Sequence, residues 1–324
     1  MSILNRPTKG QPSVLIALAK TLWGSEGLCL PSDRLLNRAA PASLYDPKQA
    51  QAQARGALNT WLKLGLFTET KDGAISFATD VFKQNRLKLQ SLLWLRGAAR
   101  EVAFRPQNND PFWASKHSSE KDEDAGDGHA SDLSRGAAWL LAQNHDSRLT
   151  SYEEAQELAS SQIGNFQLIL QNNTRWTPLV DWMFFLGLGI AGATEGGGQT
   201  LIVDPAEAIS DLLPAIFCEG AVQLSQGDFL TRLGEHLPVI DGGSYRNALE
   251  KKMTASWSGP AKGCLSPTLS RALLRLDSDR KIQLIEKADA GHGQSDAGSV
   301  PIELWFGAKE TRKFTHIALQ KGCK

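Results

Sequence analysis

Cysteine is scarce in this chain of 324 residues, and the spread of the few cysteines excludes two common classes of protein. The four cysteines lie far apart and form no C-x-x-C pair: Cys29, Cys218, Cys264 and Cys323. Zinc ribbons and disulfide-stabilised domains need cysteines paired at short or regular spacings. We therefore expect no zinc site, no disulfide framework and a reducing environment.

Long apolar runs are also absent. The longest such run, residues 182–193, is shorter than the about 20 residues that a membrane-spanning helix needs. Residues 1–11 are polar and contain proline, so they do not resemble the apolar core of a secretion signal. The sequence predicts a cytoplasmic protein without a membrane partner.

An excess of either charge is missing as well, because lysine plus arginine and aspartate plus glutamate both number 35. Zero net charge gives no general attraction to a polyanion, but a local basic surface can be balanced by an acidic loop elsewhere. Such a loop is predicted at residues 111–132, where HSSEKDEDAGDGHASD is acidic and has no buried-face pattern. We predict a flexible linker there rather than a metal site, because nothing fixes the geometry of its histidines.

Motifs of known chemistry are absent too. The sequence contains no H-E-x-x-H, no G-x-S-x-G and no H-x-E followed by P-C-x-x-C. A glycine run at residues 196–198 lacks the lysine of a phosphate-binding loop and lies between predicted strands. The acids Glu286 and Glu303, near lysines, fit ordinary strands better than a magnesium-dependent nuclease. We therefore expect no enzymatic activity, no metal and no cofactor.

One stretch has the clearest pattern in the chain: DPKQAQAQARGALNTWLKLGLFTETKDGAISFA, residues 46–78. Asp46, with proline after it, suits the start of a helix, and Gly65 suits its end. Polarity then alternates on both sides of Asp72-Gly73. Asp-Gly between two alternating runs predicts a β-hairpin.

Three further elements precede this stretch. We predict a helix at 13–23, a short strand at 27–30 and a second helix at 33–40 that Ser32 caps. Helix, strand, two helices and a hairpin follow one another as in a winged helix-turn-helix, and the resemblance covers residues 12–79. The predicted fold class is α+β, mainly α with short β-hairpins, arranged as tandem winged helix-turn-helix domains.

The third helix of this unit, residues 47–64, has two different faces. Its apolar face comprises Ala50, Ala54, Leu58, Trp61 and Leu62. Its polar face contains no acid and comprises Lys48, Gln51, Arg55, Asn59 and Lys63. These side chains are of the types that read purine edges and hold phosphates in a major groove. The other interpretation is a solvated face of an ordinary helix.

Two neighbouring features extend the predicted DNA-binding surface. Lys71 lies at the tip of the hairpin, although Glu69 and Asp72 lie there too. Residues 81–105 are predicted as one strongly basic helix, whose candidate DNA contacts are Lys83, Arg86 and Lys88. A solvated connecting helix is the alternative for this segment. The first domain is then residues 1–110.

The pattern of helices and hairpin recurs in residues 133–222. In this second winged-helix-like domain the candidate recognition helix, 176–188, is apolar. An apolar helix in that position suits core packing or a protein partner better than DNA.

A third winged-helix-like domain is predicted for residues 223–324. Its candidate recognition helix, 267–276, is followed by a long wing between strands 282–285 and 301–304. The basic residues of this helix that we expect at a second DNA contact are Arg271 and Arg275.

A second resemblance covers most of the chain. The opening SILNRPTKGQPSVLIAL, together with LGLG and VDPAEAISDLLP, resembles DpdG-like accessory components of bacterial 7-deazaguanine DNA-modification and phage-defence clusters. The resemblance implies a non-enzymatic partner of other subunits and assigns no functional residues. We expect a DNA-binding adaptor whose partners are double-stranded DNA and other proteins of a multi-component system. A protein–protein scaffold without DNA contact and a transcriptional regulator stay open as alternatives.

Overall fold

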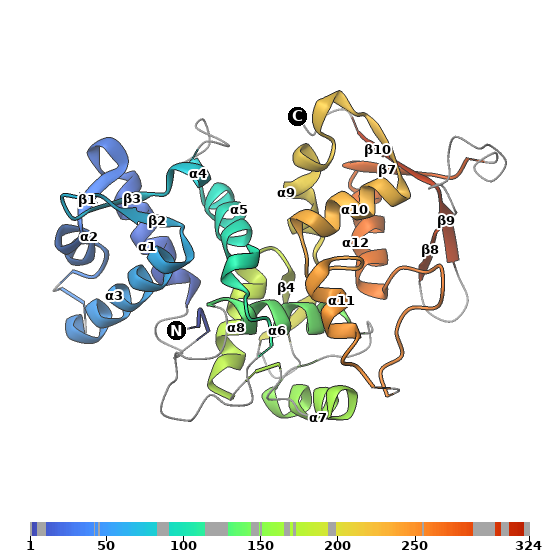
Figure 1. The fold of residues 1–324 in the computed structure, drawn as a ribbon, viewed down its shortest axis with the longest axis horizontal. Helices are drawn as coiled ribbons and strands as arrows, with labels where there is room; N and C mark the ends of the chain where they lie inside the picture. The colour runs from blue at the N-terminus through green and yellow to red at the C-terminus, as the bar shows by residue number, and fades with distance from the viewer. Residues whose placement is uncertain are drawn as a thin grey trace. The chain divides into compact units, whose positions relative to one another are not determined.

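The computed structural model is mainly helical with small antiparallel sheets, which confirms the predicted α+β class (Figure 1). It describes residues 2–4, 11–41, 43–44, 46–82, 91–113, 129–143, 149, 151–164, 169–170, 173–193, 199–254, 256–287, 302–305 and 311–320. The chain divides into two compact units. Unit 1 comprises Met1–Ser134 and Leu170–Leu186, and unit 2 comprises Arg135–Ile169 and Gly187–Lys324. The domain boundaries expected from the sequence stay predictions.

The first part of unit 1 follows the predicted order of elements. These are α1 (Pro12–Trp23), η1 (Glu26–Leu28), β1 (Cys29–Pro31), α2 (Ser32–Ala39), α3 (Pro47–Leu64), β2 (Phe67–Glu69) and β3 (Ala74–Phe77). The strands form an antiparallel sheet in the order β1-β3-β2. One detail of the prediction is wrong: Ser32 is the first residue of α2, and Pro31 occupies the cap position without a side-chain hydrogen bond.

Both ends of α3 have the predicted local causes. The Oδ1 atom of Asp46 accepts a hydrogen bond from the backbone N–H of Gln49 at 3.0 Å. Gly65 has φ of +86°, the left-handed conformation that a residue with a Cβ adopts only at a cost. The N–H groups of Gly65 and Leu66 donate to the carbonyls of Leu62 and Trp61. The chain can therefore leave the helix and enter β2 within three residues.

The predicted helix over residues 81–105 is wrong as a single element. The structure has two helices, α4 (Thr79–Phe82) and α5 (Leu92–Ala103), and residues 83–90 lie outside the described part. Ser91 is extended, with φ −114° and ψ 147°, and its Oγ accepts a hydrogen bond from the N–H of Trp94 at 3.1 Å. A serine cap satisfies an N–H group at the start of a helix, so it begins a new helix instead of continuing one.

Aromatic side chains join the hairpin to the helices of unit 1. The ring of Phe77 on β3 contacts Trp94 edge to face at 5.0 Å between centroids, and Phe67 on β2 at 5.3 Å. Trp61 on α3 contacts Trp182 on α8 (Trp176–Phe185) at 5.4 Å. The exposed face of α3 is thus held in place by a buried aromatic core on its other side.

Asn108 joins the ends of two helices in unit 1. It belongs to η2 (Pro106–Asn108), and it is only 3% exposed. Its Nδ2 donates to the carbonyl of Leu64, at the end of α3, at 2.9 Å and to the carbonyl of Val102, near the end of α5, at 2.7 Å. One amide group therefore fixes the C-terminal end of α3 to that of α5.

The end of the predicted acidic linker is helical. Residues 114–128 lie outside the described part, but α6 (Ser131–Leu141) begins inside the stretch assigned to the linker. Asp132 is fully buried, and its Oδ2 lies 2.8 Å from Nη1 of Arg175 in η4 (Asn173–Arg175). The helix thus begins two residues before the predicted start of the second domain, because the buried charge of Asp132 looks like part of the acidic run.

Unit 2 contains a hairpin, several helices and a second three-stranded sheet. Its elements up to the sheet are α7 (Tyr152–Ile163), β4 (Gly189–Ala193), β5 (Gln199–Val203), α9 (Ala206–Ile216) and η5 (Cys218–Gly220). The remaining elements are β6 (Gln223–Ser225), α10 (Gln226–His236), α11 (Ser244–Glu250), α12 (Pro267–Ser278), β7 (Ile282–Ile285), β8 (Ile302–Trp305), β9 (Thr311–Phe314) and β10 (His316–Leu319). The predicted helix at 267–276 and its Ser266 cap are confirmed.

The predicted wing between β7 and β8 is wrong. The strand β7 pairs with β10, so that Leu284 faces Ile317, and β8 pairs with β9. The sheet order is β6-β10-β7, with β8 and β9 as an inserted hairpin. In each three-stranded sheet, the strand that comes last in the sequence lies in the centre and pairs with the other two strands. The two units thus share a sheet topology.

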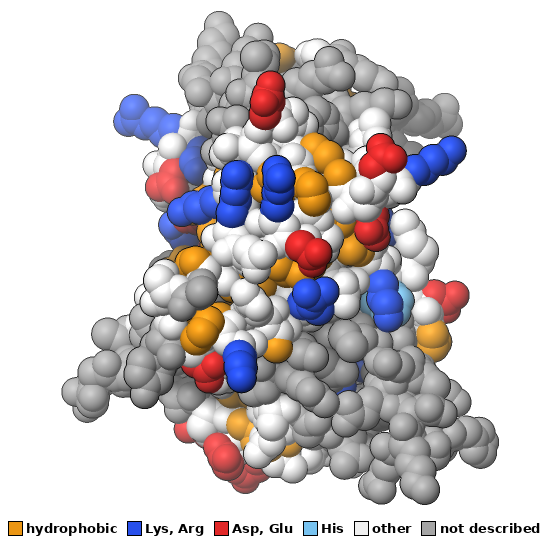
Figure 2. Space-filling model, turned by 90° about the vertical axis from the view of Figure 1, so that its left-hand side faces the viewer, with side chains coloured by type: hydrophobic (Ala, Val, Ile, Leu, Met, Phe, Trp, Pro, Cys, Tyr) orange, Lys and Arg blue, Asp and Glu red, His pale blue; other side chains and the backbone are white. Residues whose placement is uncertain are grey.

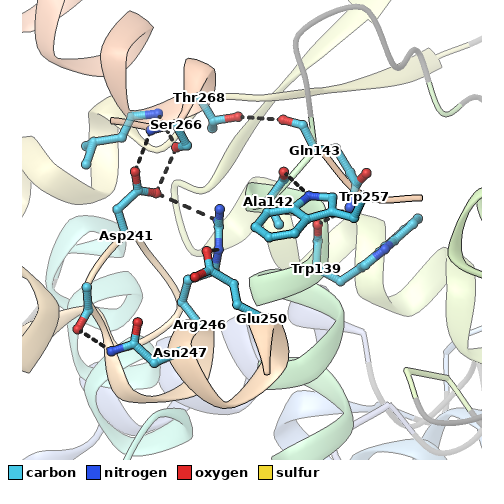
Figure 3. Close-up of polar contacts among 12 residues, drawn as sticks. Trp139, Ala142, Gln143, Asp241, Arg246, Asn247, Glu250, Trp257, Ser266 and Thr268 are labelled. Carbon is cyan, nitrogen blue, oxygen red and sulfur yellow. Dashed lines mark hydrogen bonds and ion pairs between the residues drawn. The ribbon is translucent and has the colours of Figure 1, made fainter. Parts of the chain in front are cut away.

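A polar network fixes α11 and α12 in unit 2 (Figure 3). The carboxylate of Asp241 accepts from the N–H and Oγ of Ser266, at 2.6 and 2.7 Å, and lies 3.7 Å from the fully buried Arg246. Arg246 also pairs with Glu250 at 2.6 Å and lies over the ring of Trp257. The start of α12 is therefore enclosed by protein groups.

Candidate nucleic-acid interface

The polar face of α3 is open to solvent as the sequence predicts. The exposed side chains on this face are Lys48, Ala52, Arg55, Asn59 and Lys63. Gln51, beside them, is half-buried. On the opposite side Ala54, Leu58 and Trp61 are buried, whereas Ala50 and Leu62 are half-buried. Spacings of three and four residues put the exposed side chains in one row, which we call the α3 row.

Two contacts connect α2 with the α3 row. Nη2 of Arg55 lies 4.0 Å from Oδ1 of Asp33, and Nε2 of Gln51 donates to Oδ1 of Asn37 at 3.1 Å. The pairs are four residues apart on each helix, so α2 runs beside the first half of the row. The side chains of Arg55 and Asp33 are 62% and 87% exposed, and both can also contact a ligand.

The hairpin supplies one further cation. Lys71 is exposed in the turn between β2 and β3, and so are its neighbours Glu69 and Asp72. The turn is closed by the N–H of Gly73, which donates to the carbonyl of Thr70 at 3.0 Å. The hairpin is thus formed as predicted, and its tip carries charges of both signs.

Two further basic residues, which the sequence patterns did not single out, lie on α2. Arg34 and Arg38 on α2 are exposed and lie four residues apart, which puts them on one side of that helix. They are adjacent in sequence to Asp33 and Asn37, the residues that contact α3. Their i, i+4 spacing in SDRLLNRA was the available signal.

Two arginines of the predicted basic segment, residues 81–105, have partners inside unit 1. Lys83, Arg86 and Lys88 lie outside the described residues. Arg100 is 2% exposed and donates to the carbonyl of Leu186 at 2.9 Å. Arg105 pairs with Asp80 at 2.9 Å and with Glu101 at 3.0 Å. These two arginines stabilise unit 1 instead of adding to an open basic surface.

Arg271 and Arg275 have partners inside unit 2. Arg275 forms an ion pair with Asp204 at 2.6 Å, and this hydrogen-bonded contact raises the pKa of the guanidinium. Arg271 donates to the carbonyl of Val203. The first turn of α12 is buried on all sides, from Pro267 to Ser270. Further along the helix Arg271 is half-buried, and Arg275 is exposed but paired with Asp204.

Among the described residues, one face of the molecule carries a mixture of side-chain types (Figure 2). Figure 2 shows lysine and arginine side chains interspersed with carboxylates and apolar side chains. A polyanion would therefore be attracted by individual lysine and arginine side chains rather than by a uniform positive potential.

No group of three or more histidine, cysteine, aspartate and glutamate side chains within the described ranges could hold a metal ion. In those ranges no helix has the length and apolar character needed to cross a bilayer.

The chain was also compared with known proteins. A family profile described as DpdG-like matches residues 1–290. No curated protein and no solved structure gives a significant match. Since the profile covers most of the sequence, the chain belongs to the DpdG-like family, which links it to DNA-modification systems.

Proposed function

We propose that this chain is a non-enzymatic adaptor of a bacterial DNA-modification or phage-defence system that binds duplex DNA through a winged helix-turn-helix. In this proposal α2 and α3 form the helix-turn-helix, and the β2–β3 hairpin is the wing. The α3 row enters the major groove. The partner proteins are other subunits of the same system, as membership of the family suggests.

One observation carries the proposal: α3 has an exposed, acid-free row on a helix whose two ends and buried face are fixed. A row of Lys, Arg and Asn offers charge for phosphates and donors for base edges. A helix fixed by a cap, a glycine end and an aromatic core presents these groups without further ordering, so less entropy is lost on binding.

The sheet topology shared by the two units supports a tandem arrangement of winged helices. In unit 2 the strands β6, β7 and β10 correspond to β1, β2 and β3. The helix in the position of α3 is then α12, whose first turn is buried in its own unit and whose Arg271 and Arg275 have partners there. We therefore assign DNA contact to α3 and Lys71, and we do not extend it to Arg271 and Arg275.

Fluorescence anisotropy with a labelled duplex of mixed sequence tests the proposal on the full chain. The variant Lys48→Ala/Lys63→Ala should weaken binding roughly 10- to 60-fold at 0.1 M salt and lower the salt slope by about 1.8, because each phosphate contact contributes about 0.9. The matched control is Lys251→Ala/Lys262→Ala, which removes two exposed lysines of unit 2. If the two double variants bind the duplex with equal affinity at every salt concentration, α3 does not contact DNA.

A protein–protein scaffold is the second candidate, and one observation favours it. Leu92 and Leu93, at the start of α5, are 47% and 51% exposed, which is unusual for two adjacent leucines. A chain that shows no shift with duplex DNA in size-exclusion chromatography at low salt, but co-elutes with another subunit of the system, would support this candidate.

A further inference from the structure

The acid beside Arg55 has a consequence for what this arginine can bind. Asp33 projects from α2, and its carboxylate lies 4.0 Å from the Arg55 guanidinium. Both side chains are largely exposed, so the pair contributes little to folding stability. Its effect is on incoming ligands, because any group that reaches Arg55 also comes close to a negative charge.

Phosphates and bases differ in this respect. A phosphate oxygen that accepts from Arg55 would be repelled by Asp33 at short range. The O6 and N7 atoms of guanine carry no net charge and accept two parallel hydrogen bonds from a guanidinium. Asp33 therefore penalises contact of Arg55 with the DNA backbone more than its contact with a base edge.

The two lysines at the ends of the α3 row differ from Arg55 in this respect. Lys48 and Lys63, at the two ends of the α3 row, pair with no carboxylate in the described part of the chain. Arg34 and Arg38 are exposed on α2. These positions suit phosphate contacts, which set affinity but carry no sequence information.

We propose that Asp33 is a specificity-determining residue, which keeps Arg55 off phosphates so that α3 reads guanine with Arg55 and adenine with Asn59. This inference rests on the proposed DNA-binding function and names what the same site recognises. An asparagine amide matches the N6 and N7 atoms of adenine. Arg55 and Asn59 are four residues apart, about 6 Å along the helix axis, which corresponds to about two base pairs.

Selection from a randomised duplex library, followed by anisotropy on selected and scrambled duplexes, tests this inference on the full chain. The unmodified protein should enrich a motif with a guanine and an adenine about two base pairs apart. Asp33→Asn should bind scrambled duplexes about two- to fivefold more tightly, with a salt slope steeper by up to about 0.9, and should discriminate less. Arg55→Lys keeps the charge but loses the two parallel hydrogen bonds, so it should lose the guanine preference.

The control is Glu235→Gln, which removes one exposed carboxylate from α10 in unit 2. Circular dichroism checks that every variant is folded. If Asp33→Asn has the same affinity and the same selected motif as Glu235→Gln, or binds all duplexes more weakly, the role of Asp33 is refuted. A protein that binds DNA but enriches no motif refutes base reading and leaves the proposed function standing. If the unmodified protein binds no duplex at all, the proposed function itself fails.

Discussion

Replacing Asn108 with alanine removes the two hydrogen bonds that join the end of α3 to the end of α5. The two carbonyl groups that accept these hydrogen bonds differ in whether another donor remains. The carbonyl of Val102 also accepts from the N–H of Arg105 at 3.3 Å, whereas the described residues offer the carbonyl of Leu64 no second donor. The main cost is therefore a helix-end carbonyl left buried without a partner.

The size of this effect follows from the burial of Asn108, which is 3% exposed. A buried hydrogen bond contributes about 1 kcal/mol net, and an acceptor left without a donor adds roughly 1–3 kcal/mol. We expect Asn108→Ala to lower the free energy of unfolding by about 2–4 kcal/mol. Asn108→Asp should cost more, because it places a carboxylate oxygen against two carbonyl oxygens.

Urea denaturation followed by tryptophan fluorescence measures these losses. The control is Asn37→Ala, an exposed amide that bonds Gln51 at 3.1 Å and should cost less than about 0.5 kcal/mol. If Asn108→Ala lies within about 0.5 kcal/mol of this control, or if Asn108→Asp is as stable as Asn108→Ala, the amide does not hold the two helix ends together.

Two further predictions concern acids of unit 1. Asp132→Ala should lower the free energy of unfolding, measured by urea denaturation, by roughly 3–5 kcal/mol, because it leaves Arg175 buried without the Asp132 carboxylate. Asp80→Ala removes a mostly exposed carboxylate and should lower it by about 1 kcal/mol or less. Equal losses for the two variants would contradict the role of burial. Burial raises the pKa of Asp181. A carboxyl whose folded pKa is raised stabilises the protein below its unfolded pKa, and this stability is lost as pH rises through the folded pKa. Asp181→Asn should therefore raise the thermal midpoint of unfolding at pH 7 and change it little at pH 3. The same change in midpoint at both pH values would refute a raised pKa of Asp181.

Much of the candidate interface was predictable because its causes are local. Asp46, Pro47 and Gly65 set the ends of α3, and Asp72-Gly73 sets the turn of the hairpin. The spacing of the α3 row follows from the helical repeat alone. The contacts of Asp33 and Asn37 with this row were not predictable, since they depend on how α2 crosses α3.

The two wrong predictions, for Ser91 and for the partner of β7, share a cause that is not local. The sequence pattern places Ser91 inside a basic helix, although its side chain caps a new one. The sequence pattern predicts that β7 pairs with the next strand along the chain, β8, but β7 pairs with β10, which follows an inserted hairpin. In both cases a local pattern was compatible with more than one structure, and contacts elsewhere decided between them.

By itself the sequence determined where most helices and strands begin and end, because caps, glycines and periodicity act within a few residues. The tertiary structure alone decided which cations stay open to a ligand. Arg100, Arg271 and Arg275 each meet a partner 68 to 86 residues away in the chain, so no local pattern marks them as occupied. The row from Lys48 to Lys63 stays exposed because the aromatic core holds the opposite face of α3.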